Sequence, residues 1–369
     1  KADKLAKYKS TLTNDELEEL VKKTKELKEY QDTPSSQEDL EKIPMLELSD
    51  IKREPAKDYN DVKSVDGIKI VHHNIFTNKI AYINMSFDTK CVPDELIPYM
   101  GLLGSTLSLM DTKNYTYPEL TNEININCGG LATGTALYSD KVDFSKNTIV
   151  YEVKSKALYE KVPFVLGMME EIMYNTRFDD YKRLKEIIAR IKSRLEASLM
   201  GQGHSIAMLE CCAQFSESAY YSDILRGYKY YEFIKKLDEE FEQNKTQIVD
   251  KLNKLVGYIF NKDNVIVSLT ADDEGYDCFV KALSAKSCNI KDEHYNTAVR
   301  SFIPVNVKTG YTSASQVQYV ARCGNFVKDG YKYTGALKVL KVIFSYDYLW
   351  INVRVKGGAY GCMSGSSRN

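Results

Sequence analysis

Hydrophobic residues in the first 45 positions repeat with the spacing of amphipathic helices. One helical face carries the apolar side chains Leu17, Leu20, Val21 and Leu27. Thr13 and Glu16 have the spacing of a capping box, in which each side chain bonds to the other's backbone. Ser35 and Glu38 repeat this spacing after a Pro-containing break. The pattern predicts a helical hairpin linker over residues 1–45, since the sustained heptads of a coiled coil are absent.

Residues 46–285 mix alternating and helical patterns, which predicts one complete α+β domain. Asp66-Gly67 is a turn signal between two short strand-like runs, so a β-hairpin is expected there. The expected strands are 61–65, 68–71, 80–87, 131–138, 148–153 and 264–270. The expected helices are 96–110, 118–126, 157–173, 180–199, 205–215, 229–260 and 276–283. The clearest apolar stripe lies in the fourth of these helices and consists of Leu184, Ile187, Ile188, Ile191, Leu195 and Leu199.

A second domain is expected after a break in the pattern. Residues 286–312 lack periodicity and contain Pro304, which indicates a connecting segment. Patterned sequence then resumes over 313–369. The expected elements there are a strand with Val317, Tyr319 and Ala321 on one face and helices at 334–344 and 348–355.

An internal repeat relates the two domains. In the first domain a strand and an apolar helix precede Tyr117-x-x-Leu120, a short helix and Gly129-Gly130. In the second domain the same order ends on Tyr346-x-x-Leu349 and Gly357-Gly358. We therefore expect two homologous αβ rolls, each an antiparallel sheet with packed helices, the second of them incomplete.

The composition is that of an ordinary globular protein. Of 369 residues, 43% are hydrophobic and 27% are charged, enough to bury more than one core. A formal net charge of −1 gives no global attraction to nucleic acid or membrane surfaces. No apolar run approaches the roughly 20 residues of a membrane span. The eight cysteines form no Cys-x-x-Cys pair, and their scatter indicates reduced thiols in a cytoplasm or organelle matrix.

Two other patterns have ordinary structural explanations. The helix at 181–195 is rich in Lys and Arg, but these cations surround its polar side as on a solvated face. We therefore expect no nucleic-acid partner and no membrane partner. Gly201-Gln202-Gly203 resembles half of a phosphate loop, yet no Lys-Ser/Thr follows it. We interpret Gly203 as the residue that ends the long helix.

The run Arg354-Val355-Lys356-Gly357-Gly358-Ala359-Tyr360-Gly361 has the most chemical potential. The guanidinium of Arg354 can clamp a carbonyl or carboxylate through paired donors. The hydroxyl of Tyr360 can donate to negative charge that develops on an oxygen. Gly357 and Gly358 allow a sharp turn and the close approach of another backbone. The pattern places Arg354 in the last turn of a short core helix and Tyr360 at the start of a strand.

A purely structural explanation of the same residues is also open. The helix dipole alone favours Arg in a last turn, and Gly-Gly is a common helix stop.

The run resembles the Arg-x-x-Gly-Gly-Ala-Tyr-Gly signature in the C-terminal half of the pitrilysin-type zinc peptidases, also called insulinase-like peptidases or inverzincins. Its features are most similar to those of the presequence protease and falcilysin branch. A second stretch, residues 11–31, 34–44 and 46–51, resembles the linker helices and the start of the third domain in that group. The resemblance implies that 46–285 is the family's third domain and 313–369 a truncated fourth domain. It also implies that Arg354 and Tyr360 are catalytic, and that the double glycine binds substrate.

The zinc site of that family is a His-x-x-Glu-His helix with a more distant Glu. The four histidines of this chain are His72, His73, His204 and His294, and they do not form this pattern. His72 and His73 are adjacent on an expected strand, so they point to opposite faces. We therefore expect no metal ligand in this chain. The resemblance implies that zinc is bound by an N-terminal catalytic half of the same protein.

Taken together, the resemblance implies the C-terminal portion of a zinc metalloendopeptidase that degrades unfolded peptides in a closed chamber. This portion would enclose substrate and contact the transition state, and it would be inactive alone. The alternative is a non-catalytic core or scaffold protein of the same fold, because some relatives of the fold have lost zinc. A His-x-x-Glu-His motif upstream of Lys1 would favour the peptidase. The expected location is the cytoplasm, or an organelle matrix in a eukaryote.

Overall fold

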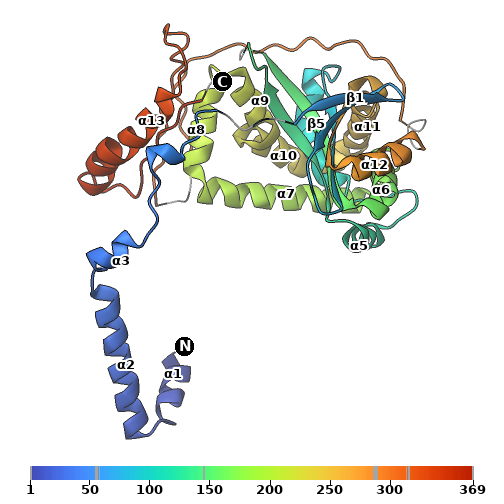
Figure 1. The fold of residues 1–369 in the computed structure, drawn as a ribbon. Coiled ribbons are helices and arrows are strands. Elements are labelled where there is room, and N and C mark those ends of the chain that lie inside the picture. Colours follow the sequence, from blue (N-terminus) through green and yellow to red (C-terminus); the bar gives the residue numbers. More distant parts are fainter. Residues whose placement is uncertain are drawn as a thin grey trace. The chain divides into compact units, whose positions relative to one another are not determined.

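The structure is a computed structural model that describes residues 2–54, 57, 59–143, 146–285, 290–312, 314 and 316–367. The chain divides into two compact units, Lys1–Lys57 and Asp58–Asn369, and each is described by itself. The first unit is helical, and the second contains a sheet with packed helices (Figure 1). No described helix is both long and apolar enough to cross a membrane.

The helices predicted for the first unit are confirmed, but one helix cap lies one residue away from its predicted position. Its elements are α1 Ala2–Lys9, α2 Asn14–Asp32, α3 Gln37–Glu41 and the 3-10 turn η1 Leu48–Asp50. The capping box at the start of α2 is present: Thr13 N–H donates to Glu16 Oε2 at 2.8 Å, and Glu16 N–H donates to Thr13 Oγ1 at 3.3 Å. The cap of α3 is Ser36, one residue later than expected, and its hydroxyl accepts from Asp39 N–H.

One six-stranded sheet organises the second unit. Its strands are β1 Asp61–Val65, β2 Ile68–Asn74, β3 Ile80–Asp88, β4 Leu131–Ser139, β5 Asn147–Leu158 and β6 Val265–Ala271. The strand order is β1-β2-β6-β3-β5-β4. The pairing of β2 with β6 is parallel, and every other pairing is antiparallel. The α+β class is thus confirmed, and the sheet is mixed rather than purely antiparallel.

The predicted Asp-Gly hairpin joins β1 to β2. Asp66 has φ 50° and Gly67 has φ 79°, the two left-handed positions that a type I′ turn needs. This turn sets the register in which Val65 faces Ile68. The hairpin prediction is confirmed, and β2 continues three residues beyond the expected end to Asn74.

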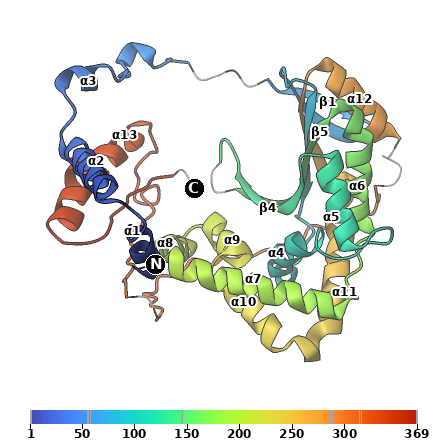
Figure 2. The same cartoon turned by 90° about the horizontal axis from the view of Figure 1, so that it is seen from below.

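Helices pack against the sheet in two layers (Figure 2). Helices α4, α6, α9 and α12 contact the strands directly, and α7, α10 and α11 lie against α4. The helical elements of this part are η2 Asp94–Leu96, α4 Ile97–Thr106, α5 Tyr117–Asn127, η3 Tyr159–Lys161, α6 Val162–Tyr174, α7 Tyr181–Gly201, α8 Gly203–Ala213, α9 Glu217–Arg226, α10 Tyr228–Glu239, α11 Phe241–Ile259, η4 Lys262–Asn264 and α12 Asp273–Ser284. As interpreted from the sequence, the long helix ends beside Gly203.

The predicted helix bounds differ from the structure by a few residues in several places, and two differences are larger. The helix expected from residue 157 starts at Val162, because β5 runs on to Leu158 and pairs with β3 as far as Ile80. The helix expected over 229–260 is two helices that break at Glu240. Helix α9 was not expected, since its sequence is polar and its apolar face is short.

Residues 290–312, here called the strap, have neither helix nor strand but follow the surface of the second unit. Ala298 N–H donates to the Lys90 carbonyl at 2.9 Å, next to the end of β3. Val305 N–H donates to the Gln214 carbonyl at 2.8 Å, just after α8. Near the end of the strap, the ring of Tyr311 lies 4.0 Å from that of Tyr228. The connecting segment expected over 286–312 stays a prediction, and its first four residues lie outside the described part of the chain; the strap itself is fastened along its length by these contacts.

The second roll expected over 313–369 is not confirmed. The described residues among 316–367 contain helix and no strand, so the strand expected at Val317, Tyr319 and Ala321 is wrong. Helix α13 Ala336–Ile343 leads directly into the π-helical segment η6 Phe344–Val355. No residue of either element is buried, which contradicts the expected core helix. Three alternating residues are a short signal, and a strand forms only where a partner strand accepts its backbone hydrogen bonds.

Glu171 of α6 is a buried carboxylate that holds the loop before α5. It is 6% exposed and accepts from the backbone N–H of Asn114 at 3.0 Å. The side-chain amides of Asn114 and Asn175 donate to its other oxygen at 2.8 Å and 2.7 Å. Burial alone would raise the pKa of Glu171, but hydrogen bonds from Thr112, Asn175 and Asn114 outweigh burial and leave the pKa below its usual value.

We predict that Glu171→Gln lowers the free energy of unfolding at pH 7 by about 1–3 kcal/mol, because amide donors then lose a charged acceptor. A depressed carboxylate pKa stabilises the fold above the unfolded-state pKa, and this stabilisation is lost as pH falls through the folded-state pKa. The difference in free energy of unfolding between the wild type and Glu171→Gln should therefore be smaller in acid. Urea unfolding at pH 7 and at about pH 3.5, below the usual pKa of Glu, measures it. The exposed Glu160→Gln is the control, and equal wild-type and Glu171→Gln stabilities at pH 7 would contradict the assignment.

Candidate functional site

The Gly-Gly turn after η6 is built by backbone hydrogen bonds. Gly358 N–H donates to the Arg354 carbonyl at 3.0 Å, and Ala359 N–H donates to the Val353 carbonyl at 3.2 Å. Gly358 has φ 73°, the left-handed conformation that commonly ends helices. A Cβ on Gly357 would lie 2.5 Å from the Val353 carbonyl oxygen. Both glycines are therefore required by the turn, and the predicted helix stop is confirmed.

Arg354 lies in the last turn of η6, as expected, and its side chain folds over the turn. Its Nε–H donates to the Tyr360 carbonyl at 3.1 Å. Its guanidinium carbon lies 4.0 Å from the ring of Trp350, a cation–π contact. These contacts orient the guanidinium, whose fork has four further N–H donors.

Tyr360 follows the turn with its side chain 87% exposed. The described residues 359–367 form no strand, so the expected position at a strand start is wrong. The structure brings Arg354 and Tyr360 together on one turn, where the Arg side chain binds the Tyr backbone. A guanidinium and a phenol on an exposed turn can both donate to a carbonyl oxygen of a bound molecule.

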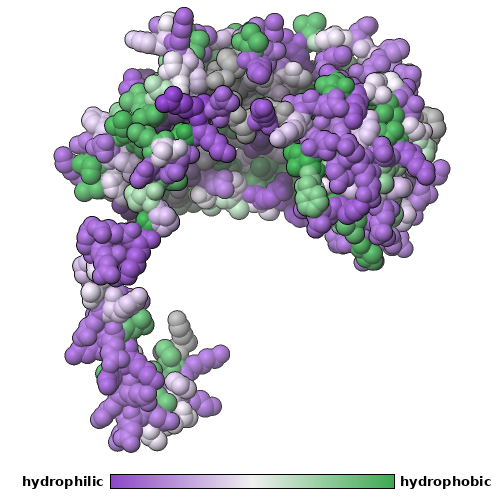
Figure 3. All heavy atoms as spheres, viewed as in Figure 1, coloured by the Kyte–Doolittle hydropathy of each residue, from purple (hydrophilic) through white to green (hydrophobic). Residues whose placement is uncertain are grey.

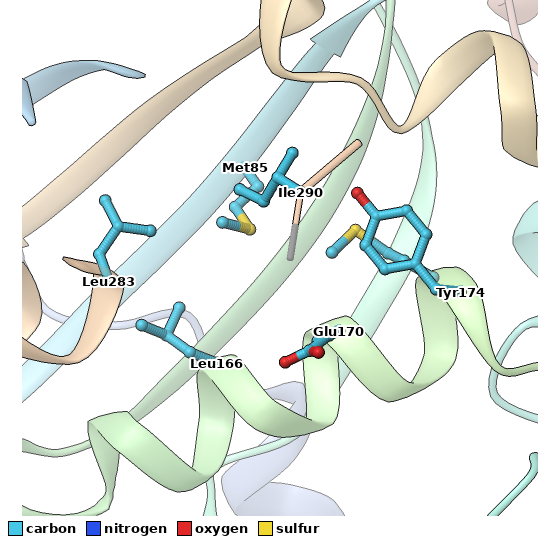
Figure 4. Close-up of a pocket in the computed structure, with 7 residues that line it drawn as sticks. Met85, Leu166, Glu170, Tyr174, Leu283 and Ile290 are labelled. Carbon is cyan, nitrogen blue, oxygen red and sulfur yellow. The ribbon is translucent and has the colours of Figure 1, made fainter. Parts of the chain in front are cut away.

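Two cavities among the described residues are lined by residues outside this turn. Figure 4 shows one beneath the sheet, with a volume of about 20 Å³, room for no more than a water molecule. It is lined by Met85, Leu166, Glu170, Met173, Tyr174, Leu283 and Ile290. A larger one of about 280 Å³ lies between α7, α8 and the α9–α10 junction. Neither contains a residue of the predicted site.

The histidines on β2 are used in the fold. His72 is 1% exposed, and its Nε2 lies 2.9 Å from the Ala271 carbonyl. Both ring nitrogens of His73 also have partners, the Tyr59 carbonyl and the Ser268 hydroxyl, each at 3.0 Å. The two side chains have separate partners, in line with the opposite faces expected for adjacent strand residues.

The other two histidines have different surroundings. The ring of His204 lies 6.0 Å from that of Tyr319. His294 is isolated in the sequence, but the structure brings it together with Asp263 and Asp292 on exposed chain. No sequence signal pointed to this group, since η4 and the strap come together only through folding. Among the described residues, the histidines do not fit a His-x-x-Glu-His zinc site.

An acidic pair, the buried Asp223 and the half-buried Glu210, gave no signal in the sequence either. Asp223 of α9 is fully buried, and Lys229 Nζ lies 3.5 Å from its Oδ2. Burial, and next the adjacent Asp223, raise the pKa of Glu210 on α8. Asp223 Oδ1 also accepts from the backbone N–H of Lys229 at 3.2 Å, which caps the start of α10. The pair therefore joins three helices of the fold, and polar residues on α8 and α9 gave no pattern to predict it.

Figure 3 shows that polar side chains dominate the visible surface, with scattered apolar patches over both units. Several exposed apolar residues belong to η6 and its flanks. They include Phe344, Tyr346, Tyr348, Trp350, Ile351 and Val353. The candidate turn thus follows an unusually apolar stretch of exposed chain.

Comparison with known proteins gives two family matches in order along the chain. Residues 1–237 match the associated domain of peptidase family M16, subfamily C, and residues 310–367 match the PreP C-terminal domain. The chain is 38% identical to Protein HypA of Clostridium perfringens (strain 13 / Type A), over 99% of this chain and 37% of that protein. It is 29% identical to Presequence protease 1, chloroplastic/mitochondrial, of Arabidopsis thaliana, over 97% of this chain and 33% of that protein.

A third relative is the mitochondrial presequence protease of Yarrowia lipolytica, with 27% identity over 100% of this chain and 36% of that protein. The chain thus spans about a third of the length of these relatives. The first family match covers more than half of the chain, and the second includes Arg354 through Tyr360. The chain therefore belongs to the family associated with peptidase M16, subfamily C, and corresponds to a portion of the C-terminal half of a peptidase of that subfamily.

Proposed function

We propose that this chain is the C-terminal portion of a zinc-dependent endopeptidase that degrades unfolded peptides inside a closed chamber. In this proposal the N-terminal half of the same protein holds the zinc ion, since the described histidines do not fit that site. The chain at hand encloses the substrate and contributes Arg354 and Tyr360. Its location is the cytoplasm or an organelle matrix, and relatives named mitochondrial or chloroplastic support the latter.

The observation that carries the proposal is the position of the Arg-x-x-Gly-Gly-Ala-Tyr-Gly run. It lies within the segment that matches the PreP C-terminal domain. In the structure it forms a turn that fixes Arg354 through two contacts and leaves Tyr360 exposed. A residue that served packing alone would be expected to bury its ring, as most core tyrosines do.

The proposed roles follow from the chemistry of the two side chains. The guanidinium of Arg354 binds the backbone carbonyl of a peptide through its paired donors. The hydroxyl of Tyr360 donates to the oxyanion that forms when the scissile carbonyl becomes tetrahedral. Gly357 and Gly358 have no side chains, so the substrate backbone can approach the turn closely. In this proposal the 313–369 segment belongs to a second αβ roll, homologous to the first.

A scaffold function has one observation in its favour. Arg354 already uses its Nε–H within the turn and lies over Trp350, so it has a structural role in this chain. On that alternative the two residues shape the turn and contact no substrate. Kinetics and stability of the same variants distinguish the two functions.

We predict that Tyr360→Phe in the full-length peptidase lowers kcat by about 100- to 1,000-fold and changes KM little, because only a transition-state donor is removed. Steady-state hydrolysis of a fluorogenic peptide, with thermal melts of the same samples, measures this. The exposed Tyr346→Phe in the same segment is the matched control. Unchanged kcat in Tyr360→Phe would end the catalytic assignment.

Arg354→Lys is expected to lower kcat and to raise KM, since an ammonium cannot reproduce the two paired hydrogen bonds that a planar guanidinium donates to a carbonyl. Combined with Tyr360→Phe, its effect should be less than additive if both groups serve one oxyanion. Lys356→Ala, an exposed cation two residues away, should leave both constants near those of the wild type. A loss of melting temperature with normal kinetics per folded molecule would instead support the scaffold function.

The chain by itself is expected to hydrolyse no peptide and to hold no stoichiometric zinc. The motivation is the lack of a chelating histidine pair among the described residues. Elemental analysis of the purified, dialysed chain checks the metal content. One tightly held zinc per chain would refute the proposed division between the two halves, and Asp263→Asn with His294→Ala would then locate the ion.

A further inference from the structure

Two thiols that are distant in sequence lie in contact in the second unit. Cys212 belongs to the last turn of α8, and Cys323 lies in the segment 316–323 that precedes α13. Their sulfur atoms are 3.1 Å apart although the residues are 111 positions apart. Both thiols are free and only partly buried. Because a disulfide has an S–S distance of about 2.05 Å, a shift of about one ångström would join them.

The segment 316–323 lies along α8, which keeps the two sulfurs together. At the start of the helix, Gly203 faces the ring of Tyr319 so closely that a Cβ there would overlap the ring. At the other end, the Cys323 thiol donates to the Met208 carbonyl at 3.8 Å. The helix rises about 13 Å from Gly203 to Cys212, and an extended chain covers about 13 Å from Tyr319 to Cys323. The two sulfurs are therefore held together by contacts of the segment 316–323 at both ends of α8, and not by the Cys212–Cys323 contact alone.

The geometry points to a redox modification site: Cys212 and Cys323 form an intramolecular disulfide when a small-molecule disulfide of the glutathione class oxidises them. The bond would fasten the segment 316–323 to α8. That segment leads into α13, η6 and the Arg354–Tyr360 turn. Any effect on peptide hydrolysis rests on the proposed function, but the bond itself does not.

The reaction balances without any other reactant. The thiolate of one cysteine attacks a sulfur of the small disulfide, forms a mixed disulfide and releases one small thiolate. The other cysteine of the Cys212–Cys323 pair then loses its proton and attacks the protein-side sulfur of the mixed disulfide. This attack releases the second small thiolate. Two protein thiols are oxidised by two electrons, the small disulfide is reduced to two thiols, and the protons pass to the released thiolates.

The surroundings of the thiols set the pH dependence. Burial raises the pKa of Cys212, and burial and the neighbouring Cys212 raise the pKa of Cys323. Since the thiolate is the attacking form, both residues react slowly near neutral pH and faster as pH rises. Besides Cys212, the titratable residues of α8 are His204, Glu210 and Cys211. Of these, Cys211 is the competitor, because it is adjacent to Cys212 and also lies within reach of Cys323.

The test uses the full chain in glutathione redox buffers of graded ratio, quenched by alkylation, digested with trypsin and analysed by mass spectrometry. Cleavage after Arg194, Arg226, Arg322 and Lys328 yields the peptides 195–226 and 323–328. The expected product is these two peptides joined, lighter than their sum by two hydrogen atoms and separated by reductant. Nonreducing electrophoresis should show a monomer, and the joined pair should form faster at pH 8.5 than at pH 7.

Three variants identify the sulfurs. Cys323→Ser and Cys212→Ser should each abolish the joined pair, and Cys211→Ser should retain it. Cys323 is only partly buried and lies outside any helix, so Cys323→Ser tests the proposal even where Cys212→Ser fails to fold. A joined pair that survives Cys212→Ser would overturn the assignment. A covalent dimer would also overturn it. So would peptides 195–226 and 323–328 that stay separate under conditions where Cys278 and Cys362, two other free and partly buried cysteines, already carry glutathione.

Discussion

The pairing of β3 on both edges is the interaction on which the rest of this chain depends. Between β5 and β6, Phe87 faces Tyr151 on one side and Val265 on the other. Every second side chain of β3 is buried from Ala81 to Phe87 against the helical layer, where the Phe87 ring meets that of Phe260 edge-on at 5.1 Å. Because the period of a strand is two, a shift by one residue would expose this whole face. The register of β3 thus fixes both halves of the sheet.

Segments that are distant in sequence are positioned by their contacts with β3 and its neighbours. Strand β6 comes almost 180 residues after β3, yet it joins the sheet between β3 and β2 and ties the first hairpin to the helices before β6. The strap passes the end of β3 and reaches the end of α8, with hydrogen bonds to the carbonyls of Lys90 and Gln214. The segment that carries the candidate turn is therefore connected to the core through the strap and its contacts on α8. Chemistry at Arg354 would depend on how firmly those contacts hold.

Local sequence patterns predicted the turns, and also the strands and helices that bury one face only. The Asp66-Gly67 turn, the alternation of β3 and the stripe of α7 were all read correctly, because turn chemistry and one-sided burial are encoded within a few residues. The start of α6 was misplaced because β5 is held to Leu158 by its partner strand, a contact that no local pattern contains. The contacts between Cys212 and Cys323 and between His294 and Asp263 could not be predicted for the same reason, since only folding brings these residues together.

The candidate turn was partly predictable. Its glycines forecast the helix stop and the position of Arg354, because a left-handed residue and a missing Cβ are local requirements. The strand expected at Tyr360 and the burial expected for η6 required a packing partner, and the described residues of this chain supply none. Family membership, in contrast, followed from the order of two sequence stretches and agrees with matches over residues 1–237 and 310–367.

The central claim is that the Arg354–Tyr360 turn touches the substrate of a peptidase, and photo-crosslinking tests it most directly. A benzophenone amino acid would replace Tyr360 in the full-length protein, with Tyr346 replaced in a parallel sample. After irradiation with a bound peptide, mass spectrometry would locate the adduct. The account predicts an adduct from position 360 next to the scissile bond and none from position 346. Labelling from 360 that is confined to the protein itself, in a sample that binds the peptide, would contradict it.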